Sequence, residues 1–367
     1  MSLDHLAHSL ICDLASGRGP AWLTTPFVSP AHLQFEKLAT TRIMSWLSPC
    51  IDSGCYPGIR RLLHNTRLGR SFLRAFFGII KNDGIQRGKF LDHPETKKLI
   101  PKDGIEWIGT TVSTFNYPTE LFDLVKEGLI NIHIADVDHL TTQAIHLSDG
   151  SNIKADVLIC ATGWDFTSNI SFLPCNLEDK IGISHAPSSD PTIALADQEL
   201  LRRFPEFEDS PMKRLQQAVV SGKEAATPDE PPSWVLYHGL VPPHFLSPRN
   251  FAYVGMAMGI RGFLLAQTEA LWITAFFDDK LSTPLPSEDE AAKQALMQNR
   301  FYKWRAPNGL GDRCSDMVFE VVPYVDTLLG ELGLETRRKG GWAEIFQYYG
   351  VGDYPNLVQE WLGTQGK

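Results

Sequence analysis

Residues 156–165 read Asp156-Val157-Leu158-Ile159-Cys160-Ala161-Thr162-Gly163-Trp164-Asp165. The run from Val157 to Cys160 is apolar and has the length of a β-strand. It ends at Ala161-Thr162-Gly163, where small side chains let the backbone leave a sheet and pass close to a bulky group. We therefore expect a buried strand that ends in a turn beside a ligand, with Trp164 packed over that turn.

The residues before this stretch predict a helix followed by a series of strands. Thr119 is a suitable N-cap and Gly128 a suitable C-terminal stop for the helix. The alternation of apolar and polar residues predicts strands over residues 105–109, 131–135, 144–147 and 152–160, with a turn at residues 148–151. A helix, a hairpin and a buried strand in this order are typical of the end of a nucleotide-binding domain.

Across about residues 116–174, including Phe172-Leu173-Pro174, this pattern resembles the flavin-containing monooxygenases and their Baeyer–Villiger relatives. The resemblance implies an α/β flavoprotein fold with two dinucleotide-binding domains, one for FAD and one for NADPH. It also implies that Ala161, Thr162, Gly163 and Trp164 link these domains, with their backbone near the cofactors. The alternative is a crossover between domains that contacts no ligand.

The family carries two Gly-x-Gly-x-x-Gly phosphate-binding loops ahead of this linker, and the sequence contains neither. We therefore expect a partial fold that lacks the N-terminal FAD Rossmann unit. Residues 1–160 are expected to form a remnant of the NAD(P)H-binding-like domain, with a helical insertion over about residues 30–95. Residues 161–367 are expected to form the C-terminal part of the FAD-binding-like domain, with a helical tail. A second chain or a homo-oligomer would cover the strand edges that such a fold exposes.

A second glycine-rich stretch runs from Tyr253 to Gly262 and precedes an apolar segment that reaches about Phe276. The pattern predicts a strand, a tight turn and a helix start, where free backbone N–H groups and the helix dipole attract an anion. The resemblance implies that this turn and helix face the flavin, which makes Gly255, Gly259 and Gly262 candidate cofactor-binding residues. The alternative, weighed equally, is a helix that packs tightly on a sheet through its glycines.

The rest of the chain is predicted to be mainly helices and loops. Helices are expected from about residue 30 to 81, near 212–220, from the acidic start at Ser287 toward Trp304, and over 317–332. Otherwise the polar segment 175–232 is expected to form loops. The basic segment 59–98 fits either a solvated helix surface or contact with an anionic ligand such as a nicotinamide dinucleotide phosphate.

Composition excludes several classes of protein. A net charge of −9 argues against a general nucleic-acid binder. The six cysteines are scattered without zinc-site spacing, so we expect no metal site and a reducing compartment, the cytoplasm. The N-terminus lacks the pattern of a signal peptide. The longest apolar stretch, residues 251–277, is interrupted by Arg261, Gln267 and Glu269, so we expect no transmembrane segment.

These observations leave three hypotheses for function. The first is an FAD- and NADPH-dependent monooxygenase that oxygenates a small organic substrate; the resemblance implies a role in fungal secondary metabolism. The second is an inactive remnant, or a half completed by another chain that supplies the phosphate loops. The third is a ligand-binding module that works without flavin. No catalytic residue is predicted, and a structural role is favoured for His238 and His244 over acid–base catalysis.

Overall fold

The computed structural model describes residues 8–12, 22–24, 35–51, 57–107, 112–114, 121–161, 170–174, 177–187, 189–221, 232–306, 310–313 and 315–365. The chain divides into two compact units. Unit 1 contains residues 1–35 and 76–166, and unit 2 contains residues 36–75 and 167–367. Residues 36–75, which we had expected in the first domain, therefore belong to the second compact unit.

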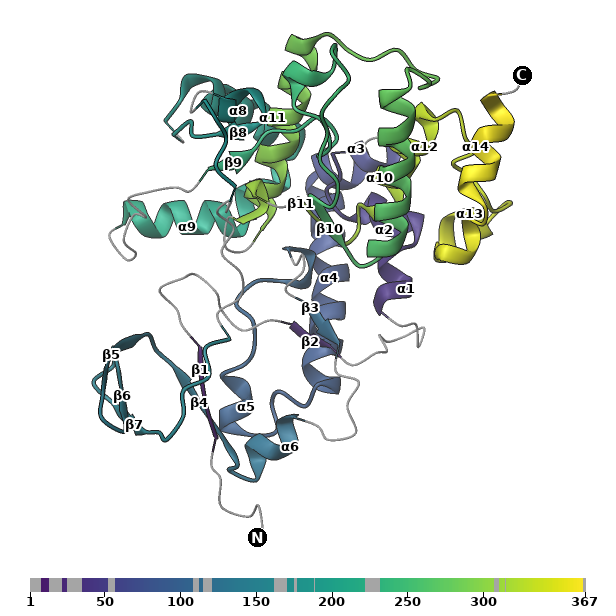
Figure 1. The fold of residues 1–367 in the computed structure, drawn as a ribbon. Coiled ribbons are helices and arrows are strands. Elements are labelled where there is room, and N and C mark those ends of the chain that lie inside the picture. The colour runs from purple at the N-terminus through teal and green to yellow at the C-terminus, as the bar shows by residue number, and fades with distance from the viewer. Residues whose placement is uncertain are drawn as a thin grey trace. The chain divides into compact units, whose positions relative to one another are not determined.

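Unit 1 combines short strands with a few helices (Figure 1). Its strands are β1 (His8–Cys12), β2 (Trp22–Thr24), β3 (Val112–Thr114), β4 (Ile130–Ile134), β5 (Val137–Thr141), β6 (Ala144–Leu147) and β7 (Asn152–Lys154). Its helices are α5 (Pro94–Lys97), η1 (Ile105–Trp107), α6 (Leu121–Lys126) and the second part of α4 (Arg67–Arg87). β1 pairs with β4 and β2 with β3, both in parallel, while β5, β6 and β7 form an antiparallel meander.

The main core of unit 1 forms where α5, α6 and β4 meet. Phe90, Leu99, Phe122, Val125 and Ile132 are buried together there. The predicted strands at 131–135 and 144–147 and the helix stop at Gly128, whose φ is +73°, are confirmed. Of the strand predicted over 152–160, only Asn152–Lys154 forms.

The predicted strand at 105–109 is wrong over the residues that the structure describes. Ile105 and Trp107 are both buried, as the alternation requires, but Trp107 N–H bonds to Gly104 C=O and closes a single 3-10 turn. A three-residue apolar alternation does not distinguish these two structures.

The prediction of a buried strand over Val157–Cys160 is also wrong. These residues are extended coil, with Val157 75% and Ile159 84% exposed. A buried strand needs neighbouring strands for its backbone hydrogen bonds and a packed face for its side chains. Among the described residues, no strand pairs with this run.

Unit 2 is mainly helical. Its helices are α1 (Phe35–Ala39), α2 (Arg42–Leu47), α3 (Pro57–Asn65), the first part of α4, α7 (Leu177–Lys180), α8 (Pro191–Arg203), η2 (Pro205–Asp209), α9 (Pro211–Val220), η3 (Pro243–Phe245), α10 (Gly262–Phe277), α11 (Glu288–Arg305), η4 (Leu310–Asp312), α12 (Val321–Glu331), α13 (Ala343–Phe346), η5 (Val351–Asp353) and α14 (Leu357–Gln365). Its strands are β8 (Ile183–Ser184), β9 (Ser233–Trp234), β10 (Ala257–Gly259) and β11 (Ser315–Met317).

Two groups of helices organise unit 2 (Figure 1): α10 packs against α12, and α11 packs against α8 and α9. The predicted helices near 212–220 and after Ser287 are confirmed as α9 and α11. The helix expected over 317–332 begins only at Val321, because Ser315–Met317 pairs with β10 as a strand. Helix α8 was missed; the Asp190 N-cap followed by Pro191 is the local signal for it.

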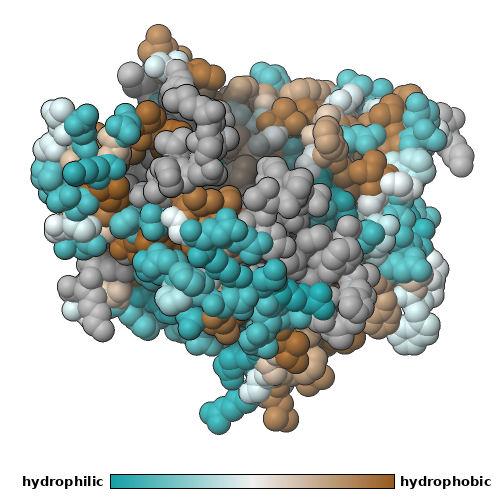
Figure 2. Space-filling model, turned by 90° about the horizontal axis from the view of Figure 1, so that it is seen from below, coloured by the Kyte–Doolittle hydropathy of each residue, from teal (hydrophilic) through white to brown (hydrophobic). Residues whose placement is uncertain are grey.

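The fold is therefore a mixed one of helices and short strands. In the part of the chain that the structure describes, the strands form five sheets of two or three strands, and none is the extended parallel sheet of a dinucleotide-binding domain. On the face that Figure 2 shows, hydrophobic groups are interrupted by hydrophilic ones. No helix among the described residues is long and apolar enough to cross a membrane.

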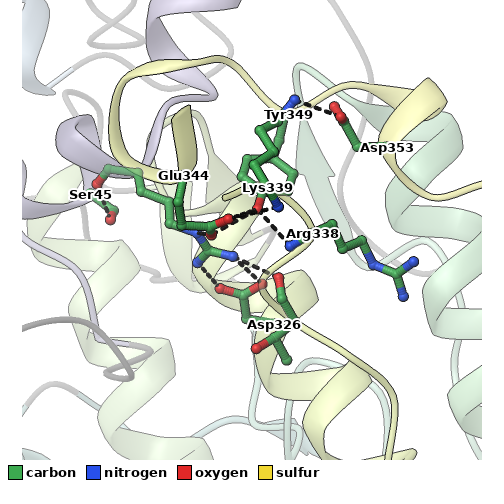
Figure 3. Close-up of polar contacts among 9 residues, drawn as sticks. Ser45, Asp326, Arg338, Lys339, Glu344, Tyr349 and Asp353 are labelled. Carbon is green, nitrogen blue, oxygen red and sulfur yellow. Dashed lines mark hydrogen bonds and ion pairs between the residues drawn. The ribbon is translucent and has the colours of Figure 1, made fainter. Parts of the chain in front are cut away.

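A buried arginine anchors the segment that follows α12. Arg42 of α2 forms ion pairs with Asp326 of α12 and Glu344 of α13, and it donates to Thr336 C=O at 2.7 Å. Tyr349 donates to Glu344 at 2.7 Å, and its ring lies 4.9 Å from the Arg42 guanidinium. Figure 3 shows the side chains of Asp326, Glu344 and Tyr349 converging from these elements. The cluster joins three helices through the ion pairs that one arginine makes with two carboxylates.

Candidate functional site

The predicted strand–turn–helix is present in unit 2 as β10, a turn at Ile260-Arg261 and α10. The strand begins at Ala257, after Gly255. Gly255 has a φ of +79°, a conformation that side-chain-bearing residues rarely adopt, and no atom lies within 4 Å of the position of an added Cβ. A glycine is therefore needed here for backbone geometry, and the space beside it is open.

The three predicted glycines fall into two groups. A Cβ on Gly259 would lie 2.7 Å from Met317 C=O and 2.9 Å from the Leu265 side chain, so this glycine lets β10 pack closely in the core. Gly262, the first residue of α10, has no atom within 4 Å of its Cβ position. Gly255 and Gly262 thus leave room for a ligand, whereas Gly259 fits the packing alternative.

The N-terminus of α10 is open to a hydrogen-bond acceptor. Arg261 occupies the N-cap position without a side-chain capping hydrogen bond, and Phe263 in the first turn is 90% exposed. The first N–H groups of a helix have no partner within the helix and carry partial positive charge. The start of α10 can therefore stabilise a negatively charged or electron-rich group placed against it.

A buried carboxyl group fixes the backbone of the turn at Gly255 through a hydrogen bond. Glu269, one of the interruptions of the apolar stretch, accepts from Gly255 N–H at 3.1 Å. The Tyr324 hydroxyl donates to Glu269 at 3.3 Å and to His238 C=O at 2.9 Å. Glu269 is 1% exposed, and this burial raises its pKa above the ordinary value. The turn is thus fixed by a hydrogen-bond network that reaches α12.

A second glutamate, the half-buried Glu331, lies in the same network. Glu331 accepts from Trp272 Nε1 at 2.7 Å, His238 Nε2 at 2.9 Å and the Tyr237 hydroxyl at 3.3 Å. Burial alone would raise the pKa of Glu331, but these three partners outweigh it and lower the pKa. Burial and the nearby Glu331 charge raise the pKa of Tyr237.

Sequence reasoning missed both glutamates and Tyr324. The one available signal was a charged residue, Glu269, inside an apolar helix. His238 and His244 each pair with a glutamate, Glu331 and Glu288 respectively, which supports a structural role for both histidines.

The first predicted site is only partly described. Ala161 is exposed coil in unit 1, and Thr162, Gly163 and Trp164 lie outside the described residues. Gly255, Gly259 and Gly262 belong to unit 2. On α10 itself, Gln267 is exposed, whereas Trp272 is fully buried and points its indole N–H at Glu331. Trp272 is therefore a core residue.

The sequence of the chain was compared with known proteins and with protein-family models. No protein-family model matches the chain. The FAD-dependent monooxygenase avaB of Aspergillus versicolor is 24% identical over 98% of this chain and 57% of its own length. The FAD-dependent monooxygenase DEP4 of Alternaria brassicicola is 24% identical over 98% of this chain and 63% of its own, and rstn6 of Aspergillus nomiae is 28% identical over 74% and 46%.

The chain is a relative of the fungal FAD-dependent monooxygenases. It spans 46–63% of the length of the three relatives described above. The expectation drawn from residues 116–174 is confirmed at the level of this family.

The residues present fit one edge of an FAD molecule. The open positions at Gly255 and Gly262 and the uncapped start of α10 can receive the electron-rich edge of a flavin ring. The sequence contains no Gly-x-Gly-x-x-Gly loop of the kind that holds the FAD pyrophosphate. The described residues also hold no group of three or more potential metal ligands. The start of α10 thus has open space and free N–H groups for an electron-rich group.

Proposed function

We propose that the chain is the flavin-ring-binding part of an FAD- and NADPH-dependent monooxygenase that acts on a small organic substrate in fungal secondary metabolism. The observation that carries this proposal is the uncapped N-terminus of α10 beside the open glycines Gly255 and Gly262. The names of the fungal relatives support the cofactor, FAD. On this proposal the chain is a partial two-dinucleotide-binding-domain fold, with 1–160 derived from the NAD(P)H domain and 161–367 from the FAD domain.

In this function the residues of the chain position the flavin. The backbone N–H groups at the start of α10 hold its electron-rich edge, and Glu269 keeps the Gly255 turn in the required conformation. FAD, when bound, supplies the redox chemistry, accepting a hydride and activating oxygen. The backbone of Ala161, Thr162, Gly163 and Trp164 would contact the cofactors as the linker between the two domains.

A second candidate is that the chain is an inactive remnant, or one half of an enzyme that needs a partner chain to be active. The exposed apolar run at Val157 and Ile159 favours it, because an apolar segment left in solvent usually marks a surface that another polypeptide covers. That partner would supply the missing strands and the phosphate-binding loops. The sequence lacks both of those loops, which supports the same candidate.

An FAD titration of the purified chain tests the proposal. We expect bound FAD, seen as a change in its visible spectrum, and loss of binding in Gly262→Trp, whose side chain fills the space in front of α10. Gly330→Trp is the matched control, because Gly330 is also exposed in a helix with no atom within 4 Å of its Cβ position.

The outcomes separate the two candidates. FAD that binds, is bleached by NADPH and is restored by oxygen supports the monooxygenase. Equal FAD binding by Gly262→Trp and the control removes the α10 turn from the site. If the purified chain does not bind FAD, the proposal that this polypeptide alone binds the flavin is refuted. The partner-dependent half is then favoured.

A further inference from the structure

The surface of α3 and of the first turns of α4 (Figure 1) carries large apolar side chains that are exposed. Ile59 and Leu62 of α3 are 41% and 62% exposed, and Leu68 and Phe72 of α4 are 86% and 54% exposed. Leu73 of α4 is buried, so apolar side chains of this helix point both to the core of unit 2 and to solvent. Single exposed apolar residues are ordinary, but a group of them marks a surface that binds a partner.

A tight corner between the two helices brings these side chains close together. Gly69 of α4 is buried, and a Cβ at this position would overlap the C=O group of Leu62. The backbone of α4 therefore touches the end of α3, and Leu68 lies beside Leu62. Spacings of three and four residues place Ile59 with Leu62, and Leu68 with Phe72, on one face of each helix.

The same stretch of chain is basic and contains no acidic residue. Residues 57–75 include five arginines and no Asp or Glu, although the whole chain has a net charge of −9. Arg61 and Arg67 are the neighbours of Leu62 and Leu68 in the sequence, and both arginines are exposed. Neither forms an ion pair with a residue that the structure describes. These two cations are therefore available to an anionic partner.

The acidic residues of η2, which packs against α3, do not neutralise Arg61 and Arg67. Each of them already has a basic partner: Glu206 with His64, Glu208 with Lys213, and Asp209 with Arg74. The Arg74–Asp209 pair is exposed, with 3.6 Å between its charged atoms, so it holds Arg74 only weakly. The exposed charge beside the apolar side chains thus remains positive.

A surface of one charge sign with apolar side chains between the charges fits an anionic lipid bilayer. Such a bilayer is negative over its whole surface and apolar directly below it, so one partner satisfies both kinds of side chain. The guanidinium group also matches the geometry of phosphate oxygens. A second copy of the chain, docked through the same surface, would place arginine against arginine.

From these contacts, we propose that the α3–α4 surface binds the surface of an anionic lipid bilayer. The α3–α4 surface consists of Ile59, Arg61, Leu62, Arg67, Leu68 and Phe72. Its apolar side chains enter the boundary between head groups and acyl chains, and its arginines pair with the lipid phosphates. The docking uses residues of unit 2 alone and does not need FAD, so it stands or falls separately from the proposed function.

Sedimentation of the purified chain with lipid vesicles tests the proposal. We expect binding to vesicles of phosphatidylcholine with about 30% phosphatidylserine, and no binding to phosphatidylcholine alone. About 0.5 M NaCl should abolish binding, because salt screens exposed charges. Arg61→Gln combined with Arg67→Gln should weaken binding about thirtyfold, as the loss of two basic residues near an anionic membrane predicts. Arg202→Gln combined with Arg203→Gln, on α8, is the matched control with the same change in net charge.

A second variant tests the apolar part of the surface. Leu68→Gln should weaken binding to the anionic vesicles about tenfold, because an apolar side chain no longer leaves water. Since Leu68 is 86% exposed, the variant should stay folded, which circular dichroism checks. The control is Leu195→Gln on α8, where the leucine is 66% exposed. Hydrogen exchange of the wild type should slow in residues 57–75 when anionic vesicles are added.

Three results would overturn the proposal: no binding to either kind of vesicle, equal binding to both kinds, or equal loss of binding in the α8 controls. Self-association that Leu68→Gln abolishes, in a chain that does not bind vesicles, would show that this surface binds a polypeptide instead.

Discussion

Two glutamates of one network, the buried Glu269 and the half-buried Glu331, have pKa values shifted in opposite directions. Glu331 has three hydrogen-bond donors and a lowered pKa, whereas Glu269 has fewer and a raised pKa. We expect Glu331→Gln to destabilise the protein at pH 7 by about 2 kcal/mol, the usual cost of losing charge-assisted hydrogen bonds. Urea unfolding measures this cost, and an unfolding free energy equal to the wild type's at pH 7 would contradict it.

The pH dependence of the two variants should also differ in sign. A lowered carboxyl pKa adds stability that is present above the ordinary value of 4.5 and is lost as the pH falls through the folded-state pKa. The disadvantage of Glu331→Gln should therefore shrink below about pH 4.5. Glu269 has a raised pKa, so its contribution is lost as the pH rises above 4.5, and Glu269→Gln should gain on the wild type in that direction. Parallel pH profiles for the two variants would refute this assignment.

Replacing Arg42 should reduce the stability of a long stretch of chain, residues 336–350. Arg42→Met leaves the carboxylates of Asp326 and Glu344 buried without their cation, which typically costs about 3–5 kcal/mol. Hydrogen exchange should become faster in residues 336–350. The control is Arg202→Met, which removes an exposed ion pair to Glu199 and should change stability little. Unchanged exchange in residues 336–350 would show that the cluster does not anchor this segment.

At the scale of elements, α11 is a helix whose start is encoded by its own N-terminal residues. Ser287 caps it by accepting from Glu290 N–H, and residues 288–290 place acidic charge in the first turn. Ser287→Ala should destabilise unit 2 by about 1 kcal/mol. Ser221→Ala, at the other end of a helix, is the matched control. A melting temperature shifted equally by both variants would argue against the cap.

At the scale of the whole molecule, each compact unit has its own core. Phe204, Phe207 and Phe301 pack with ring centroids 5.2–5.6 Å apart in unit 2, and Ile132 is buried in the core of unit 1. Phe207→Ala should cost about 3–5 kcal/mol and Ile132→Ala about 2–5 kcal/mol. Hydrogen exchange should locate the first effect in residues 189–221 and 288–305, and the second in residues 121–154. Loss of protection across both units in either variant would mean that they unfold as one.

Sequence reasoning succeeded for features that depend on neighbouring residues. The start of α11 at Ser287, the end of α6 at Gly128 and the turn at Asp149-Gly150 all follow from hydrogen bonds and backbone angles within a few positions. The similarity to the fungal FAD-dependent monooxygenases could also be inferred from the sequence, at residues 116–174. The failures are the strands expected at 105–109 and 157–160, where an apolar run was present but the neighbouring strand was not.

By itself, the sequence determined the position of many helix ends and turns, the similarity to fungal FAD-dependent monooxygenases, and the helix that begins at Gly262. Only the tertiary structure decided that Gly259 serves packing and that Glu269 and Glu331 form one network. The physical reason is how far apart along the chain the interacting residues are. Caps and turns are satisfied within one or two turns of chain, whereas burial, pKa shifts and cavities depend on residues as far apart as Arg42 and Glu344.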